Sequence, residues 1–297
     1  MKSPRRRTLL WLGGGLLFAY LAVVAFMAVS EPRLVYPGSV GRGGAHAFPE
    51  AGSVAWDTLR VAAPDSVPVL LLLARLPNPD SHPWILFFHG NGGLLGSGGS
   101  VARYRLFQEA GFNVAAAEYR GYGASSGFGP PSEAGLYDDA MGAWSYLTRD
   151  LRIPRERIAV FGWSLGSGPA TYVAAHGHPA TLLTEGAFTS LPDVAATMYP
   201  WLPVHLIMRN RFDNLRRVGD LQVPWIVFHG RHDTEVPFSE GQALAAADPS
   251  ARLVPLDAGH EDGITKDTAV ALGALRSIAH HLVPLDSSGE RAALKPR

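Results

Sequence analysis

A serine lies between two glycines near the middle of the chain, in the segment GWSLG at residues 162–166. The serine of a G-x-S-x-G pattern can act as a nucleophile when a buried strand precedes the pattern and a helix follows it, because the sharp turn then holds the serine hydroxyl clear of the sheet. Residues 157–161 fit such a strand, and small residues after position 166 favour such a helix. We therefore predict that Ser164 is a nucleophile. The alternative is a small-residue turn whose serine does no chemistry.

A serine hydroxyl needs a base to remove its proton, and an acid must orient that base. The acid and then a histidine are expected later in the chain, each just after a strand. Asp233 follows the apolar run 225–228, and His260 follows the run 252–256. We predict that His260 accepts and returns the proton and that Asp233 orients its ring. The competing acids, by proximity in the sequence, are Asp257, Asp262 and Glu235.

The reaction also needs two backbone N–H groups to stabilise a negatively charged oxygen. One predicted donor is the amide of Leu165, where the helix after the serine begins. The other is the amide of Asn91, in the glycine-rich segment 87–93, where glycines allow a close backbone approach. A crossover loop without a ligand is the alternative. Phosphate binding is not predicted, because Gly-Lys-Ser/Thr does not follow. The sequence assigns no other substrate-binding residue.

Short apolar runs alternate with helical segments between residues 53 and 285. Two runs separated by a Pro-Asp turn indicate an antiparallel hairpin, at 54–61 and 67–74. The later runs suit strands buried on both faces of a parallel sheet, at 84–88, 112–117, 157–161, 181–184, 225–228 and 252–256. The helices are expected at 101–110, 133–149, 165–175, 239–246 and 266–281. We therefore predict one α/β domain, with a mostly parallel eight-stranded sheet covered by helices on both faces.

The N-terminus carries a basic segment, residues 1–8, followed by an uncharged run from Leu9 to Val29. At about 1.5 Å per residue, this run forms a helix of roughly 31 Å, which matches a hydrocarbon core. We predict a transmembrane signal anchor with a cytoplasmic N-terminus and the catalytic domain on the far, extracytoplasmic side. A cleaved export signal is the alternative, because residues 28–30 fit a cleavage site. Residues 30–52 are expected to form a flexible linker, and residues 286–297 a tail.

The composition limits the kinds of partner and of chemical site that the protein is expected to have. The 297 residues include 26 basic and 26 acidic side chains, so the net charge gives no reason to expect nucleic acid. The chain contains no cysteine, which excludes disulfides, thiolate metal sites and a cysteine nucleophile. The predicted chemistry uses neither a cofactor nor a metal. The expected partners are an acyl substrate and a membrane.

Five segments in order resemble the α/β-hydrolase superfamily, and the resemblance covers about residues 54–283. They are FHGNGG at 88–93, YRGYG at 119–123, GWSLG at 162–166, EGAFTS at 185–190 and HGRHD at 229–233. The set is similar to the membrane-anchored α/β-hydrolase domain-containing branch, with its lysophospholipase-like and acyl-protein-thioesterase-like members. This resemblance implies an α/β-hydrolase fold, a triad of Ser164, Asp233 and His260, and an oxyanion hole formed by the amides of Asn91 and Leu165. Glu118 stands where Asp is common, which should affect packing more than chemistry.

The segment 191–215 falls where this fold usually inserts a cap, and it is too short for a large lid. Its apolar residues either wall an acyl pocket, touch a membrane or pack on the sheet, and the sequence leaves these choices open. The function that we expect is hydrolysis of a carboxylic ester or thioester of a lipid-like or acylated substrate, through an acyl-enzyme on Ser164. A serine peptidase or amidase is the first alternative. A membrane-tethered binding protein without activity is the second.

Overall fold

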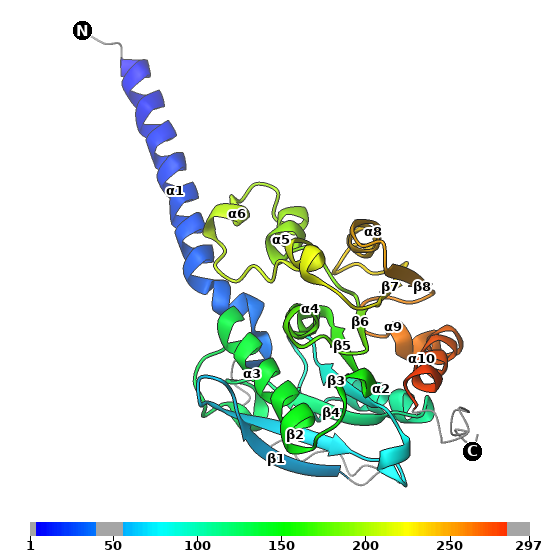
Figure 1. Ribbon diagram of the computed structural model, residues 1–297. Helices are drawn as coiled ribbons and strands as arrows, with labels where there is room; N and C mark the ends of the chain where they lie inside the picture. Colours follow the sequence, from blue (N-terminus) through cyan, green and yellow to red (C-terminus); the bar gives the residue numbers. More distant parts are fainter. Residues whose placement is uncertain (1–3, 40–55, 284–297) are drawn as a thin grey trace.

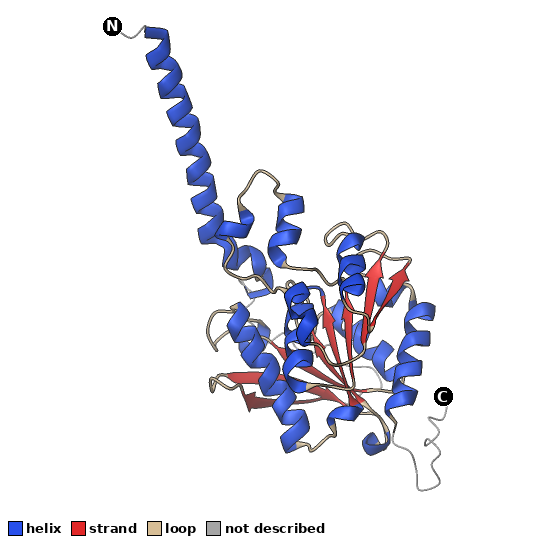
Figure 2. Ribbon diagram, turned by 45° about the horizontal axis from the view of Figure 1, so that its top comes forward, coloured by secondary structure: helices blue, strands red, loops and turns tan. Residues whose placement is uncertain are grey.

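The computed structural model describes residues 4–39 and 56–283. Its centre is an eight-stranded sheet in the order β1-β2-β4-β3-β5-β6-β7-β8 (Figures 1 and 2). The strands are β1 Trp56–Ala62, β2 Pro68–Ala74, β3 Trp84–Phe88, β4 Asn113–Glu118, β5 Ile158–Trp163, β6 Thr181–Glu185, β7 Trp225–Gly230 and β8 Ala251–Leu256. β2 pairs antiparallel with both β1 and β4, and the strands from β3 onward pair in parallel. The predicted hairpin and mostly parallel sheet are confirmed.

Helices cover both faces of the sheet, as predicted (Figure 2). They are α1 Pro4–Val35, α2 Gly98–Glu109, α3 Glu133–Ser145, α4 Ser167–Gly177, α5 Leu191–Met198, α6 Val204–Ile207, α7 Asn214–Arg217, α8 Phe238–Ala247, α9 Gly263–Lys266 and α10 Thr268–Leu282. The strands β3 to β6 are buried along their whole length, because apolar side chains from both faces enter a core. One core lies under α3, α4 and α8, and the other under α2, α9 and α10. The carboxyl ends of the parallel strands therefore meet at one edge.

The N-terminal helix is longer than the sequence predicted. α1 runs past Val29 to Val35, where a flexible linker was expected, and its far end projects from the domain (Figure 1). The helix continues because its last turns dock on the domain. The Glu31 carboxylate accepts hydrogen bonds from the amides of Arg209 at 2.8 Å and Asn210 at 2.7 Å. The remainder of the expected linker, residues 40–52, and the tail at 286–297 lie outside the described residues.

The short cap lies between β6 and β7. It contains α5, α6 and α7, joined by loops, within the predicted segment 191–215 and just beyond it. Ser190 caps α5, because its hydroxyl accepts a hydrogen bond from the amide of Asp193. Phe212 packs the cap onto the domain. Its fully buried ring lies edge-on against the rings of Tyr36 and Tyr137. The cap is thus fixed both to the domain and to the end of α1.

Candidate active site

Ser164 sits on a sharp turn at the carboxyl end of β5. Its φ angle is +52°, in the left-handed region that side chains other than glycine rarely occupy. The flanking glycines make this turn sterically possible. A Cβ at Gly162 would collide with the carbonyl of Gly166, and a Cβ at Gly166 would collide with the carbonyl of Phe88. One 3₁₀ turn, Ser164–Gly166, then leads into α4. The structure thus has the strand–turn–helix context that the G-x-S-x-G pattern requires.

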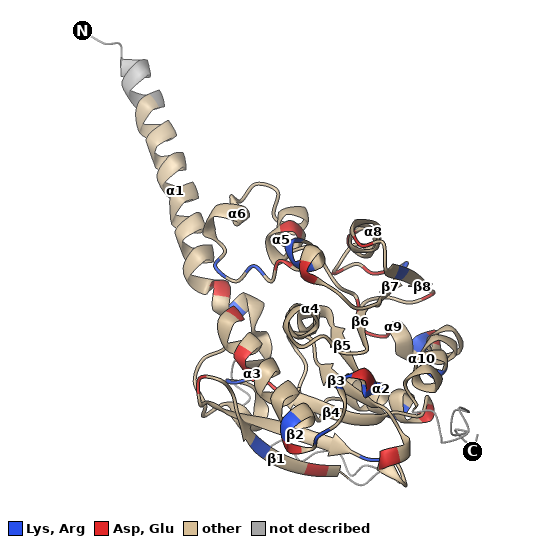
Figure 3. Ribbon diagram, viewed as in Figure 1, with Lys and Arg blue, Asp and Glu red and all other residues tan. Residues whose placement is uncertain are grey.

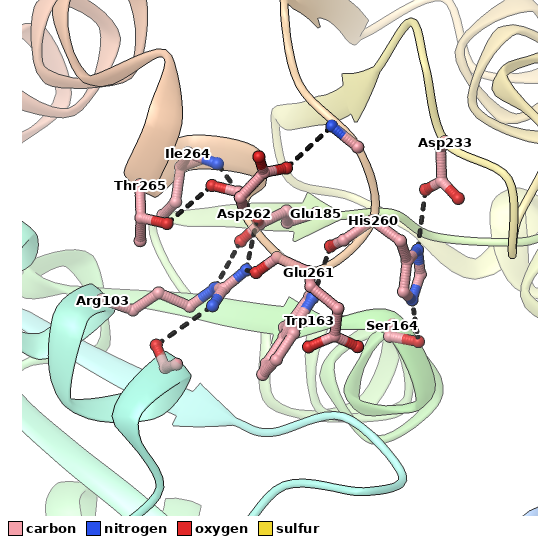
Figure 4. A network of polar contacts seen from close by, with 12 residues as sticks. Arg103, Trp163, Ser164, Glu185, Asp233, His260, Glu261, Asp262, Ile264 and Thr265 are labelled. Atoms are coloured by element: carbon pink, nitrogen blue, oxygen red, sulfur yellow. Dashed lines mark hydrogen bonds and ion pairs between the residues drawn. The ribbon is translucent and has the colours of Figure 1, made fainter.

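Of the three residues predicted as a triad, His260 lies within hydrogen-bonding distance of both Ser164 and Asp233. The His260 Nε2 atom is 2.8 Å from the Ser164 Oγ atom, and the His260 Nδ1 atom is 2.7 Å from Asp233 Oδ2 (Figure 4). The other Asp233 oxygen accepts the amides of Glu235 at 2.9 Å and Val236 at 2.8 Å, which fixes the carboxylate. These contacts join the loops after β5, β7 and β8 at one edge of the sheet. The arrangement can move a proton from the serine to the histidine.

Burial and charge oppose each other at His260 and Asp233. Burial by itself disfavours the charged imidazole, but the hydrogen bond and negative charge of Asp233 outweigh it and raise the pKa of His260 above 6.5. Burial also disfavours the Asp233 carboxylate. Hydrogen bonds with His229 and His260, and the charge of His260, outweigh that effect and lower the pKa of Asp233 well below 3.8. At neutral pH the acid therefore stays ionised beside its histidine.

Two of the competing acids make contacts elsewhere, and the third faces the cavity. Asp257 is exposed and pairs with His232 at 3.0 Å. Asp262 accepts the amide of Gly259 at 2.8 Å and helps to shape the turn before His260. Glu235 lines the cavity beside the serine. Of the acids weighed from the sequence, Asp233 is therefore the one that the structure sets against the His260 ring.

The glycine-rich loop after β3 is held firmly around the predicted donor Asn91. The Gly90 carbonyl lies 2.8 Å from His89 Nδ1 and accepts the Gly93 amide at 3.0 Å. Because a trans peptide is planar, fixing this carbonyl also fixes the Asn91 N–H in the opposite direction. The Asn91 carbonyl accepts the Tyr122 hydroxyl at 3.0 Å.

Glu118 supports the same loop from the end of β4. Its carboxylate lies 2.9 Å from His89 Nε2 and accepts the Leu95 amide at 3.2 Å. The Tyr119 hydroxyl donates to the His89 carbonyl at 2.9 Å. Glu118 therefore acts on packing, because its contacts hold the loop and do not involve the serine.

Two buried charges of opposite sign support the histidine loop, and sequence reasoning did not predict their pairing. The Arg103 guanidinium donates to both oxygens of Glu185, at 2.7 and 2.6 Å, and to the carbonyl of Glu261 at 3.2 Å (Figure 4). It also stacks over the ring of Trp163 at 3.6 Å, whose indole N–H donates to the His260 carbonyl at 3.3 Å. The partners come from α2, β5, β6 and the loop after β8. Local patterns do not reveal a pair 82 residues apart.

Ser164 lies where two cavities meet. The larger, of about 300 Å³, has mostly apolar walls from the cap and from the end of α1. Its apolar lining includes Met27, Leu34, Phe188, Met198, Leu202 and Ile207, and it also contains Asn91, Leu165 and His260. The smaller, of about 230 Å³, is bounded by the glycine-rich loop, Trp163 and Glu261. The sequence did not place α1 at the site, although a charged residue directly after an uncharged run was visible. Within residues 4–39 and 56–283, the structure contains no group of three or more His, Asp or Glu side chains that could hold a metal ion.

Known proteins are similar to this chain in sequence or in fold. A family model described as alpha/beta hydrolase fold matches residues 83–182. An uncharacterised protein of Mycobacterium tuberculosis is 33% identical over 260 residues, covering 86% of this chain and 89% of that protein. The lysophosphatidylserine lipase ABHD12 of Danio rerio is 32% identical over 182 residues, which are 55% of this chain and 47% of that protein. The Pyrococcus furiosus esterase Pf2001 superposes with a TM-score of 0.65 and 18% identity, covering 80% of this chain and 95% of that chain. The chain therefore belongs to the α/β-hydrolase superfamily, within the ABHD branch.

Proposed function

We propose that this hydrolase is a serine esterase or thioesterase that cleaves acylated, lipid-like substrates through an acyl-enzyme on Ser164. The observation that carries the proposal is the chain of two hydrogen bonds from Ser164 through His260 to Asp233, at 2.8 and 2.7 Å. The strained turn at Ser164 supports it, because such strain is characteristic of this kind of nucleophile.

In the proposed reaction, Ser164 Oγ attacks the substrate carbonyl carbon while His260 Nε2 takes the hydroxyl proton. The Asn91 and Leu165 amides are proposed to hold the oxyanion of the tetrahedral intermediate. His260 then gives its proton to the departing alcohol or thiol, which leaves the acyl group on Ser164. Water attacks this acyl-enzyme, His260 takes the proton from the water, and the carboxylic acid leaves with Ser164 restored.

The two cavities suggest which part of the substrate binds on each side of Ser164. The apolar cavity suits the acyl chain, because methionine, leucine and isoleucine side chains form much of its wall. The smaller cavity suits the polar leaving group, because backbone groups of four glycines and the Glu261 side chain are available there. The name of the similar ABHD12, a lysophosphatidylserine lipase, is consistent with a single-chain lipid ester.

We also propose that α1 holds the enzyme in a membrane. Residues 10–35 form a helix long and apolar enough to cross a bilayer, and none of its most apolar window is buried in the protein. The basic residues before it favour a cytoplasmic N-terminus and a catalytic domain on the far side.

Activity-based labelling tests the proposed nucleophile. The detergent-solubilised full chain should react with a fluorophosphonate and hydrolyse p-nitrophenyl esters, with little turnover of aminoacyl anilides. Ser164→Ala should abolish the labelling and lower kcat by roughly 10⁶-fold, while the melting temperature changes little. Labelling that persists in Ser164→Ala would assign the nucleophile elsewhere, and faster anilide than ester turnover would favour an amidase.

A further inference from the structure

The end of α1 is part of the domain surface. One face of the helix is partly or fully covered by the domain, at positions 24, 27, 28 and 31, whereas most of the side chains between them are exposed. This spacing is that of a single helix face. Glu31, which is 4% exposed, binds the backbone of the cap at Arg209 and Asn210. The end of α1 and the cap therefore form one unit.

The cap touches α1 at a depth that a bilayer would reach. The Tyr20 hydroxyl donates to the Trp201 carbonyl at 3.1 Å. The candidate span begins at Leu10, and a hydrocarbon core of about 30 Å takes about 20 residues, which reaches Val29. Tyr20 lies only about 15 Å along the helix from Leu10, near the middle of that length. A bilayer crossed by α1 would therefore surround the tip of the cap, which consists of the loop between α5 and α6 and of α6 itself, residues 199–207.

The cap has the composition that such a position needs. The sequence contains no Asp, Glu, Lys or Arg from Val194 to Met208, and in Figure 3 the α6 ribbon lies beside α1 with no residue coloured as Lys, Arg, Asp or Glu. His205 is the basic residue within α6. Trp201 is 55% exposed and Leu206 is 86% exposed, and neither lines the cavity at Ser164. Large apolar side chains that are exposed and grouped in this way mark a contact surface.

The backbone of the cap tip is also suited to a low-dielectric medium. Unpaired N–H and C=O groups are costly in lipid. In the loop between α5 and α6, Pro200 and Pro203 have no N–H to satisfy. The Leu202 amide donates to the Tyr199 carbonyl at 3.0 Å, the Val204 amide donates to the Leu202 carbonyl at 2.8 Å, and Tyr20 satisfies the Trp201 carbonyl.

The cavity at Ser164 extends to this boundary. Met27 and Leu34 of α1 and Met198 and Ile207 of the cap line the same cavity as Ser164. Met198 is also 58% exposed, so it reaches both the cavity and the outer surface. An acyl chain that passes between α1 and the cap would therefore reach the serine without crossing water.

We propose that the cap tip inserts into the leaflet on the side of the domain, and that the acyl chain of a membrane-resident ester enters the cavity laterally between α1 and the cap. This inference rests on the proposed function for its substrate. The insertion itself depends on the proposed membrane span of α1 and on the position of the cap along it. In this arrangement α1 has a second role, because it also forms one wall of the cavity that binds the acyl chain.

Insertion is tested without catalysis. The chain contains no cysteine, so Leu206→Cys provides a unique labelling site, and Val270→Cys on α10 provides a matched control that is 43% exposed. Each full-length variant carries a fluorophore and is reconstituted into phosphatidylcholine vesicles with nitroxide-labelled acyl chains. We expect strong quenching at position 206 and little at 270. Equal quenching at both positions would overturn the proposal.

Entry of the substrate is tested by activity. Trp201→Glu and Leu206→Glu should slow hydrolysis of a long-chain p-nitrophenyl ester in vesicles by at least about 10-fold, because a carboxylate in the leaflet is costly. Their turnover of p-nitrophenyl acetate in water should match that of wild type and of Val270→Glu. Unchanged rates on the vesicle substrate would refute lateral entry. Loss of all ester turnover and labelling in the wild type would instead refute the proposed function, and the quenching result would still stand.

Discussion

The buried ion pair between Arg103 and Glu185 offers a sharp test of how the site is supported. The Arg103 side chain is fully buried, and that of Glu185 is 2% exposed. Arg103→Met removes the guanidinium but keeps an apolar chain over Trp163. The Glu185 carboxylate then stays buried without its counter-ion, although the Ile264 amide still donates to it at 3.0 Å.

The structure sets the size of the effect. Removing one partner of a buried pair costs about 3–5 kcal/mol, because the other charge is left in a low-dielectric interior. For a domain of this size, about 1 kcal/mol shifts the melting temperature by roughly 2–4 °C. We therefore expect Arg103→Met to melt about 6–20 °C below the wild type. It should also slow fluorophosphonate labelling of Ser164, because Trp163 and Glu261 lose a contact that holds the His260 loop.

The assay is thermal unfolding of the full chain in detergent, followed by circular dichroism. Arg276→Met is the matched control, because its pair with Glu109 is exposed, with side chains 56% and 57% accessible. Pairs of this kind contribute about 0.2–1 kcal/mol, so its melting temperature should change by at most about 4 °C. The double variant Arg103→Met with Glu185→Leu should melt above Arg103→Met, because no charge remains buried.

Two results would refute this reasoning. The first is a shift for Arg103→Met no larger than that for Arg276→Met. The second is a double variant that melts no higher than Arg103→Met, because the loss would then come from packing and not from an unpaired charge.

Four further predictions concern the triad and the anchor. Asp233→Asn should lower kcat about 10⁴-fold, because asparagine favours the wrong histidine tautomer. Asp257→Asn and Asp262→Asn should have mild effects on ester turnover, and a larger loss for Asp257→Asn would identify Asp257 as the acid of the triad. Since His260 must be neutral to act as the base, kcat/KM of the wild type should fall as pH drops through the raised pKa of His260, with a midpoint above 6.5. In Asp233→Asn the negative charge is gone while burial still lowers the pKa of His260, so the midpoint should move to lower pH. In thermal unfolding, the His260–Asp233 contact should contribute its full stability between about pH 3.8 and pH 6.5, the ordinary pKa values of the two groups. That stability should be lost as pH rises through the raised pKa of His260 and lost again as pH falls through the lowered pKa of Asp233; a pH profile without this trend would contradict the assigned coupling. The full-length chain should remain in membranes after a carbonate wash, whereas N-terminal sequencing of a soluble chain that starts at Glu31 would identify a cleaved export signal.

The sequence by itself determined the order of the strands along the chain and the central motif. Runs such as 84–88 are apolar throughout because both faces of their strand are buried, so composition alone predicts them. Gly162 is needed because a Cβ there would meet the Gly166 carbonyl within the same turn, so the G-x-S-x-G turn at Ser164 could be predicted from five consecutive residues. Gly166, by contrast, makes room for the Phe88 carbonyl of β3, which is remote in the sequence. Local rules of this kind depend on neighbours in the chain, which the sequence contains.

Only the tertiary structure showed which distant groups meet. The sequence favoured Asp233 over Asp257 as the acid, but the contact of Asp233 with the imidazole, and of Asp257 with His232, depends on how the loops after β7 and β8 fold together. The extension of α1 beyond Val29 depended on the cap, because amides at 209 and 210 bind Glu31 from 178 and 179 residues away. The Arg103–Glu185 pair depended in the same way on packing between α2 and β6. These contacts form because folding brings remote backbone and charges together in a buried place, and no pattern of neighbouring residues records that.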